Sequence, residues 1–394
     1  HNRTMSVREG FRHSVNLVFI RMLRDIVKYY QSTSEDPVSE ILTQRDHPRR
    51  ADYLNRFADR EGKIYLRRYY KDYGDLAPDE ALELLANRIR PASHRLAVVF
   101  RSVRPQAPIQ DLSQFMLQRL STNAISQPQL RKLYEGYGPQ AFDLHDRSYI
   151  AGVHPLELWL VGYLQSRPGA SLREALEASA DARQEVYQWL FKAGRKRAAD
   201  TRIRILAEED AFKKVHASWR RQGYPFASLV PSLATAIGSS ADRPAALAEL
   251  IGIILNDGIR LPTVHVQSIH FAEDTPYETH LSRKADAGER ALPKQVTKVL
   301  RRALEDVVAH GTARRLSGVF DDAEGRPFLV GGKTGTGDEL IERFGPGTSA
   351  AEDKEVSRSA AFAFFLGGRH FGVITAHVPG PNVKGRRFTS ALPT

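Results

Sequence analysis

Four adjacent residues, Lys333, Thr334, Gly335 and Thr336, could together bind and polarise an acyl substrate. The lysine could supply a positive charge for a substrate carboxylate or manage a proton, and the threonine hydroxyls could donate hydrogen bonds to that carboxylate. Glycine has no side chain, so an extended substrate could lie against this segment as an added strand. A backbone N–H just past the glycine could point at a developing oxyanion. The alternative interpretation is a polar turn after an edge strand, because four-residue motifs also arise by chance.

A second candidate is the tripeptide Ser14-Val15-Asn16. The serine could relay a proton to a leaving amine, and the asparagine could hold a substrate amide and orient a catalytic lysine. Alternatively, Ser14 could simply be the N-cap of the following helix, and a serine can cap a helix and relay a proton at the same time. The pattern recurs at Ser121-Thr122-Asn123, inside a helical stretch far from strand-like sequence. We therefore favour Ser14 and Asn16, and expect them to lie close to Lys333 at one end of an antiparallel sheet.

The nucleophile that should accompany these residues is missing from the sequence. Serine acyl transfer needs a serine activated by a neighbouring base, yet no serine in the chain has a lysine three positions later. The chain starts at His1 and both of its ends look cut. We therefore expect the nucleophilic serine and its lysine to lie in a segment upstream of this chain, which would then be inactive alone.

The rest of the sequence predicts the elements that must position these residues. Apolar residues at helical spacing predict a helix from Ser14 to about Tyr30. Residues 41–223 also have helical periodicity throughout and show no strand-like alternation. From Tyr224 onward helices and strands mix. The expected elements there are helices over 245–255 and 293–310 and strands over 263–269, 326–330, 359–366 and 371–378. The predicted fold class is α+β, an antiparallel sheet packed with helices and carrying a large helical insertion.

These motifs give the chain a resemblance to the transpeptidase domain of class A penicillin-binding proteins, bifunctional enzymes with an upstream glycosyltransferase domain. Ser-x-x-Lys, a Ser-x-Asn form and Lys-Thr-Gly make up the motif set of penicillin-binding proteins and class A β-lactamases. The further matching stretches are Phe11-Arg12-His13-Ser14-Val15-Asn16-Leu17, Pro231 to Gly238 followed by Leu247 to Pro262, Gly311-Thr312-Ala313, and Ala360 to Pro379. The resemblance covers residues 1–30 and 224–394, which would form the transpeptidase core. Residues 31–223 would then be a helical insertion or elaboration.

The resemblance implies a penicillin-binding D,D-transpeptidase domain that crosslinks peptidoglycan stem peptides by serine acyl transfer. In that case Ser14, Asn16 and Lys333 would be catalytic, and Thr334, Gly335 and Thr336 would bind substrate. The implied partners are peptidoglycan stem peptides, the lipid-linked precursor and β-lactam antibiotics, with no cofactor. The implied location is periplasmic or extracytoplasmic, with attachment to the inner membrane through an anchor upstream of this chain.

Composition leaves a second class of function open. Lys and Arg number 57 against 46 Asp and Glu, a net charge of +11 that favours anionic partners. The alternative is therefore a noncatalytic basic helical module that binds wall polymer or nucleic acid, although we do not expect nucleic acid. The absence of cysteine excludes disulfides, thiolate zinc sites and cysteine nucleophiles. The closest histidines, at 265, 270 and 280, have no carboxylate at ligand spacing, so no metal site is predicted.

Overall fold

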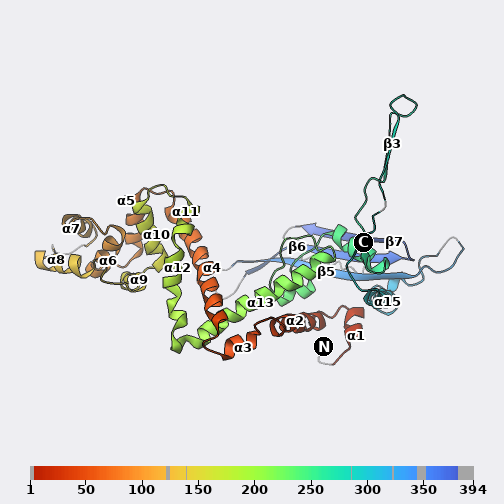
Figure 1. The fold of residues 1–394 in the computed structure, drawn as a ribbon, viewed down its shortest axis with the longest axis horizontal. Helices are drawn as coiled ribbons and strands as arrows, with labels where there is room; N and C mark the ends of the chain where they lie inside the picture. The colour runs from red at the N-terminus through yellow and green to blue at the C-terminus, as the bar shows by residue number, and fades with distance from the viewer. Residues whose placement is uncertain are drawn as a thin grey trace. The chain divides into compact units, whose positions relative to one another are not determined.

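A computed structural model describes residues 4–120, 125–138, 140–284, 286–321, 324–343 and 352–379 (Figure 1). The chain divides into two compact units. The first, here called the sheet unit, combines His1–Thr33 with Glu208–Thr394, and the second, the helical unit, is Ser34–Ala207. No helix among the described residues is both long and apolar enough to cross a membrane.

The helical unit contains only helices in its described part. They are α3 (Val38–Thr43), α4 (Pro48–Tyr73), α5 (Pro78–Arg88), α6 (Ser93–Val103), α7 (Ile109–Leu117), α8 (Gln127–Gly136), α9 (Leu144–Ala151), α10 (Pro155–Ser166), α11 (Leu172–Ala178), α12 (Ala180–Tyr187), the short 3₁₀ helices η1 (Gln188–Phe191) and η2 (Ala193–Arg195), and the start of α13 (Lys196–Arg221). Proline is the first residue of α4, α5 and α10, where its fixed φ suits a helix start and its missing N–H leaves no bond unmade. Tyr73, Phe100 and Leu160 are among the fully buried side chains of its core.

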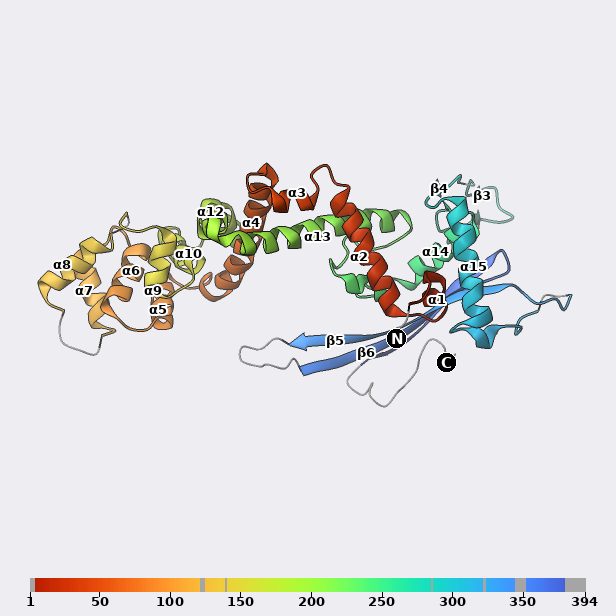
Figure 2. The same cartoon turned by 90° about the horizontal axis from the view of Figure 1, so that it is seen from below.

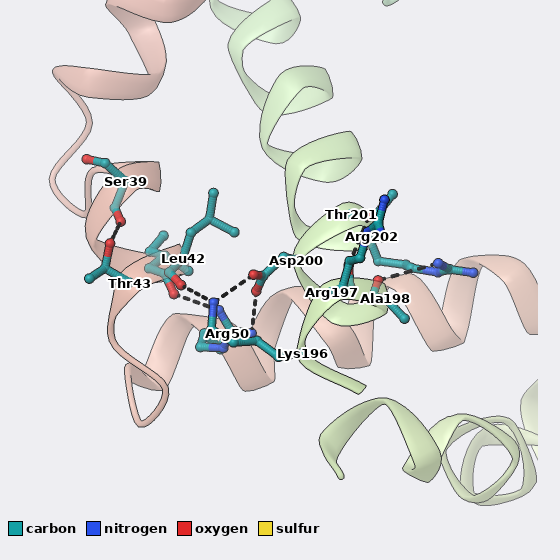
Figure 3. A network of polar contacts seen from close by, with 11 residues as sticks. Ser39, Leu42, Thr43, Arg50, Lys196, Arg197, Ala198, Asp200, Thr201 and Arg202 are labelled. Atoms are coloured by element: carbon teal, nitrogen blue, oxygen red, sulfur yellow. Dashed lines mark hydrogen bonds and ion pairs between the residues drawn. The ribbon is translucent and has the colours of Figure 1, made fainter. Parts of the chain in front are cut away.

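A buried charge network joins α4 to α13 in this unit (Figure 3). The Arg50 guanidinium donates to the Asp200 carboxylate at 2.7 Å and to the Ile41 carbonyl at 2.9 Å. Lys196 donates to the other oxygen of Asp200 at 2.8 Å and to the Leu42 carbonyl at 2.9 Å. Burial alone would raise the pKa of Asp200, but the hydrogen bonds from Lys196 and Arg50 outweigh it and lower that pKa. Each buried charge therefore has partners.

The sheet unit combines helices with antiparallel strands. Its helices are α1 (Val7–Arg12), α2 (Asn16–Ser32), the end of α13, η3 (Leu233–Ile237), α14 (Pro244–Leu255), α15 (Lys294–His310) and η4 (Arg314–Leu316). Its main sheet has the order β5 (Val330–Arg343), β6 (Glu352–Leu366), β7 (His370–Pro379). Two smaller pairs are β1 (Ile259–Arg260) with β4 (Glu289–Arg290), and β2 (Ser268–Phe271) with β3 (Thr279–Ser282). This arrangement confirms the predicted α+β class with its large helical part.

Helices α14 and α15 pack against the main sheet, α15 beside β5 and α14 beside β6 and β7 (Figure 2). Val307 and Val308 of α15 share a buried cluster with Val330 of β5. Leu304 of the same helix packs with Phe365 of β6. The helices that sequence periodicity predicted over 245–255 and 293–310 therefore supply the buried side of this sheet.

The strand that carries the lysine motif differs from its prediction. A strand was expected over 326–330, with the motif after it, whereas β5 begins at Val330 and runs through the motif. Gly331 pairs with Phe365 and Gly332 with Phe364 across the ladder. A Cβ on Gly331 would collide with the Phe365 ring, and one on Gly332 with the ring of Phe362. The two glycines thus keep the strand going because they leave room for aromatic rings, rather than ending it in a turn.

The strand predicted over 263–269 is also shifted, because β2 covers only Ser268–Phe271. Residues 261–271 are all exposed, so no core selects one face of this segment. Strand pairing is limited to Ser268–Phe271, which lie opposite Thr279–Ser282 of β3. Alternation alone therefore placed this strand several residues too early.

Candidate active site

The centre of the candidate site is a contact between two side chains 319 positions apart in the sequence. Lys333 Nζ, from β5, donates a hydrogen bond to Ser14 Oγ, in the turn between α1 and α2, at 2.7 Å. The same ammonium donates to the Thr334 carbonyl at 2.8 Å. The expected proximity of Ser14 and Lys333 is therefore observed. The competing tripeptide at 121–123 lies outside the described residues.

Lys333 is a half-buried cation whose charge has no anionic partner in the described part of the chain. Its ammonium lies 5.7 Å from the centre of the Phe11 ring. Burial disfavours the charged form of an amine, and it lowers the pKa of Lys333 to about 8. At neutral pH the side chain is thus mostly in its ammonium form but gives up one proton far more readily than an exposed lysine does.

Ser14 is held in an unusual backbone conformation. Its N–H donates to the Phe11 carbonyl and the N–H of Val15 donates to the Gly10 carbonyl, the two bonds of a Schellman motif that ends α1. Ser14 occupies the left-handed position of that motif, with φ of 54°. Glycine is usual there, because a Cβ in this region is strained. The prediction that Ser14 caps the following helix is wrong, since Val15 is the N-cap of α2 and makes no side-chain cap bond.

The remaining polar candidates differ in exposure. Asn16 is the exposed first residue of α2, and its side chain makes no hydrogen bond within the described structure. Gly335 and Thr336 are exposed on β5, and a Cβ on Gly335 would meet nothing within 4 Å. These three residues therefore border solvent next to the Lys333–Ser14 contact.

Thr334 is less accessible than Gly335 and Thr336, which follow it on β5. The residue is buried, with 6% of its surface exposed, and its hydroxyl pairs with that of Thr312 at 2.7 Å. The backbone N–H of Thr312 also donates to the Arg12 carbonyl at the end of α1. Gly311 packs so closely on that carbonyl that a Cβ would collide with it. Thr334 therefore links β5 to the end of α1 through Thr312, and its contact with a substrate carboxylate stays a prediction.

A charge cluster that the motif search missed fixes α1 on α15. Arg12 donates to both oxygens of Asp306, at 2.9 and 3.0 Å, and Arg8 and His310 lie at 3.2 and 3.1 Å from the same carboxylate. Burial alone would raise the pKa of Asp306, but hydrogen bonds from Arg12, His310 and Arg8 lower it below its usual range. The signal that could have revealed this residue is an aspartate directly before the buried pair Val307-Val308.

Strand β5 is an edge strand of the described sheet, because β6 pairs on one side of it and no described strand pairs on the other. The open backbone edge includes the segment around Gly335 and Gly337, where an added Cβ would meet nothing within 4 Å. An unpaired edge offers N–H and C=O groups to an extended peptide. The site can therefore accept a peptide strand beside a half-buried amine and a serine hydroxyl.

Comparison with known proteins gives likeness in structure only. No known protein family and no curated protein matches the sequence. Similar solved structures include penicillin-binding protein 3 of Mycobacterium tuberculosis complexed with aztreonam, at 16% identity over 45% of this chain and 43% of that chain, with a TM-score of 0.26. Penicillin-binding protein 2B of Streptococcus pneumoniae strain R6 matches at 17% identity over 45% and 30% of the two chains, with a TM-score of 0.32.

The D,D-transpeptidase domain of a peptidoglycan glycosyltransferase from Eggerthella lenta is similar at 16% identity, over 45% of this chain and 46% of that chain, with a TM-score of 0.28. Each of these three matches spans less than half of the solved chain.

Proposed function

We propose that this chain carries the Ser-x-Asn and Lys-Thr-Gly parts of a penicillin-binding D,D-transpeptidase site, and that the nucleophilic serine with its lysine base lies outside these 394 residues. The observation that carries the proposal is the hydrogen bond from Lys333 Nζ to Ser14 Oγ. Two residues whose types suit acyl-transfer chemistry, 319 positions apart in the sequence, meet at hydrogen-bond distance. A polar turn would give no reason for a buried amine to meet a strained serine.

The contact suits a proton relay. Because Lys333 donates to Ser14 Oγ, the hydroxyl proton of Ser14 is free to point at a leaving amine. When the carbon–nitrogen bond of the substrate breaks, the amine takes the Ser14 proton and the Ser14 oxygen takes one from Lys333. The lowered pKa of Lys333 makes that transfer easier than it would be from an exposed lysine. Attack by an acceptor amine on the acyl intermediate would move the protons in the opposite direction.

Substrate binding would use the open side of β5. A stem peptide would add as a strand along the Gly335 edge, with Asn16 and Thr336 bordering it. An ammonium has three donors, and two of them bind Ser14 and the Thr334 carbonyl. The third can bind a substrate carboxylate, such as that of a terminal D-alanine or of a β-lactam. In this proposal the complete protein works outside the cytoplasm on peptidoglycan precursors, attached to the inner membrane, and a glycosyltransferase domain lies upstream.

Labelling with a fluorescent penicillin tests this function. The 394-residue chain should form no covalent adduct, whereas the protein extended upstream to include a Ser-x-x-Lys segment should form one. In the extended protein, Lys333→Ala should slow acylation by about 10²–10³-fold, the usual loss for one preorganised electrostatic contact. The exposed Lys298 on α15 provides a matched control, and Lys298→Ala should leave the rate unchanged.

The outcomes separate the two classes of function. An adduct on the 394-residue chain would show that the nucleophile is present after all. An extended gene without Ser-x-x-Lys would favour the noncatalytic binding module. Unchanged acylation in a folded Lys333→Ala protein would contradict the catalytic role of Lys333 and leave the lysine motif as a structural part of β5.

A further inference from the structure

The β2–β3 hairpin brings together three potential metal ligands that are separated in the sequence. Antiparallel pairing places His270 of β2 directly opposite His280 of β3. Glu278 lies two residues before His280, and side chains two apart on extended chain share a face. The hairpin extends away from the main sheet (Figure 1), and all three side chains are exposed.

The three side chains already converge on one point. The Nε2 atoms of His270 and His280 lie 2.8 Å and 3.2 Å from the same oxygen, Oε1, of Glu278. The two imidazole rings stack with centres 3.7 Å apart and planes inclined by 17°. One ligand atom from each residue lies within 4.8 Å of the other two. Ligand atoms about 2 Å from a common metal ion would be separated by distances of this order.

We propose that His270, Glu278 and His280 bind a divalent transition metal ion, Zn²⁺ in the first instance. Two imidazole nitrogens and one carboxylate form a ligand set that suits zinc and copper, whereas Mg²⁺ and Ca²⁺ prefer oxygen ligands. Three protein ligands leave one position of a tetrahedral zinc ion for water. The site is separate from the Lys333 site and does not depend on the transpeptidase proposal.

The polar contacts of the cluster are ones that a metal ion can replace. Each imidazole directs its Nε2 atom at the same oxygen of Glu278. Once the protons of these two contacts are released, two ring nitrogens and one carboxylate oxygen are left to bind an ion. The separation of His270 from His280 by the hairpin loop explains why sequence spacing did not reveal the site.

The ion would have a structural consequence for this hairpin. An exposed two-stranded hairpin is only marginally stable by itself in water. A metal ion bound to both strands would hold the His270–His280 register in place. Binding should therefore slow amide exchange of β2 and β3.

The test is calorimetric titration of the full 394-residue chain with zinc chloride. We expect one saturable site, weakened about 100-fold by His270→Ala or His280→Ala and at least about tenfold by Glu278→Gln. Losing even a residue that only orients a metal ligand costs about 10–100-fold in metal affinity. His265→Ala is the matched control, because His265 is exposed in the same segment but outside the cluster, and it should leave affinity unchanged. Magnesium should not compete.

Hydrogen exchange keeps the result interpretable if a variant loses its hairpin. Zinc should protect the β2 and β3 amides of the unmodified chain and of His265→Ala, and should not protect those of Glu278→Gln to the same degree. No saturable zinc binding would overturn the proposal. So would zinc binding that survives the substitutions at 270, 278 and 280 unchanged, because the ion would then sit elsewhere.

Discussion

Arg50 in the helical unit and Lys333 in the sheet unit are both withdrawn from solvent, but they have different partners. In the helical unit, Arg50 is 8% exposed and bonds to the Asp200 carboxylate, which Lys196 also contacts. In the sheet unit, Lys333 bonds only to a hydroxyl and a backbone carbonyl within the described structure. A buried charge without a counter-ion costs free energy. The paired cation can thus be explained by architecture, whereas the unpaired one points to chemistry, because perturbed titratable groups concentrate at functional sites.

Backbone strain follows the same division. In the helical unit, the described residues with positive φ are glycines, Gly152 and Gly169. In the sheet unit, the described residues other than glycine with positive φ are Ser14, Ala241, Asp257, Ala272 and Asp274. Of these, Ser14 is the one whose hydroxyl is the partner of Lys333. Strain of this kind persists where surrounding contacts enforce it, often at active sites. Here the Asp306 cluster and Thr312 enforce the position of the α1 end.

The largest change in the free energy of unfolding is expected from breaking the charge pair in the helical unit. Asp200→Asn should lower the free energy of unfolding by about 3 kcal/mol, because it leaves Arg50 buried without a counter-charge. Chemical denaturation of the full chain, followed by circular dichroism, measures the change. The Lys333 contact should remain intact in this variant.

The control replaces both partners. Arg50→Met with Asp200→Leu removes the charges together and fills similar volume, so it should cost much less than Asp200→Asn alone. If the double variant were as unstable as Asp200→Asn, the hydrogen bonds of the pair would themselves stabilise the fold, beyond keeping each buried charge neutralised. The architectural interpretation of this network would then need revision.

A pH titration tests the unpaired cation next. The pKa of Lys333 is lowered from 10.5 to about 8 by burial, so between these pH values the unfolded chain holds a proton that the folded chain has lost. Stability should therefore rise with pH across this window, because the cost of burying the charge, present below pH 8, is relieved. The contribution should be on the order of 1–2 kcal/mol once the partial exposure of the ammonium is allowed for.

The reference for this titration is Lys333→Met, which cannot change charge. Unfolding free energies of the two proteins should be measured from pH 7 to 11. The free energy of unfolding of the unmodified protein should rise relative to that of Lys333→Met between about pH 8 and 10.5. An equal pH dependence in both would show that Lys333 has an ordinary pKa. The contrast with Arg50 would then lose its main support.

Local patterns predicted much of this structure, and tertiary contacts decided the rest. Periodicity was enough to predict α14 and α15, and residue types were enough to predict that Ser14 and Lys333 lie close together. Sequence could not show that Thr334 turns inward to Thr312, because that depends on where the chain passes the end of α1. Nor could it show that Gly331 continues β5, since the reason is a phenylalanine ring on another strand.

The smallest expected effect separates backbone strain from side-chain chemistry at Ser14. Ser14→Gly and Ser14→Ala both remove the hydroxyl that accepts from Lys333, so both should slow acylation in the extended protein to a similar degree. Only glycine relieves the left-handed backbone at φ of 54°. Ser14→Gly should therefore be more stable than Ser14→Ala by about 1 kcal/mol, the cost of a Cβ in this region. Paired unfolding curves of the two variants measure that difference directly. Equal stabilities would mean that the turn relaxes freely around residue 14, and the serine would then be positioned by its bond to Lys333 rather than by an enforced backbone.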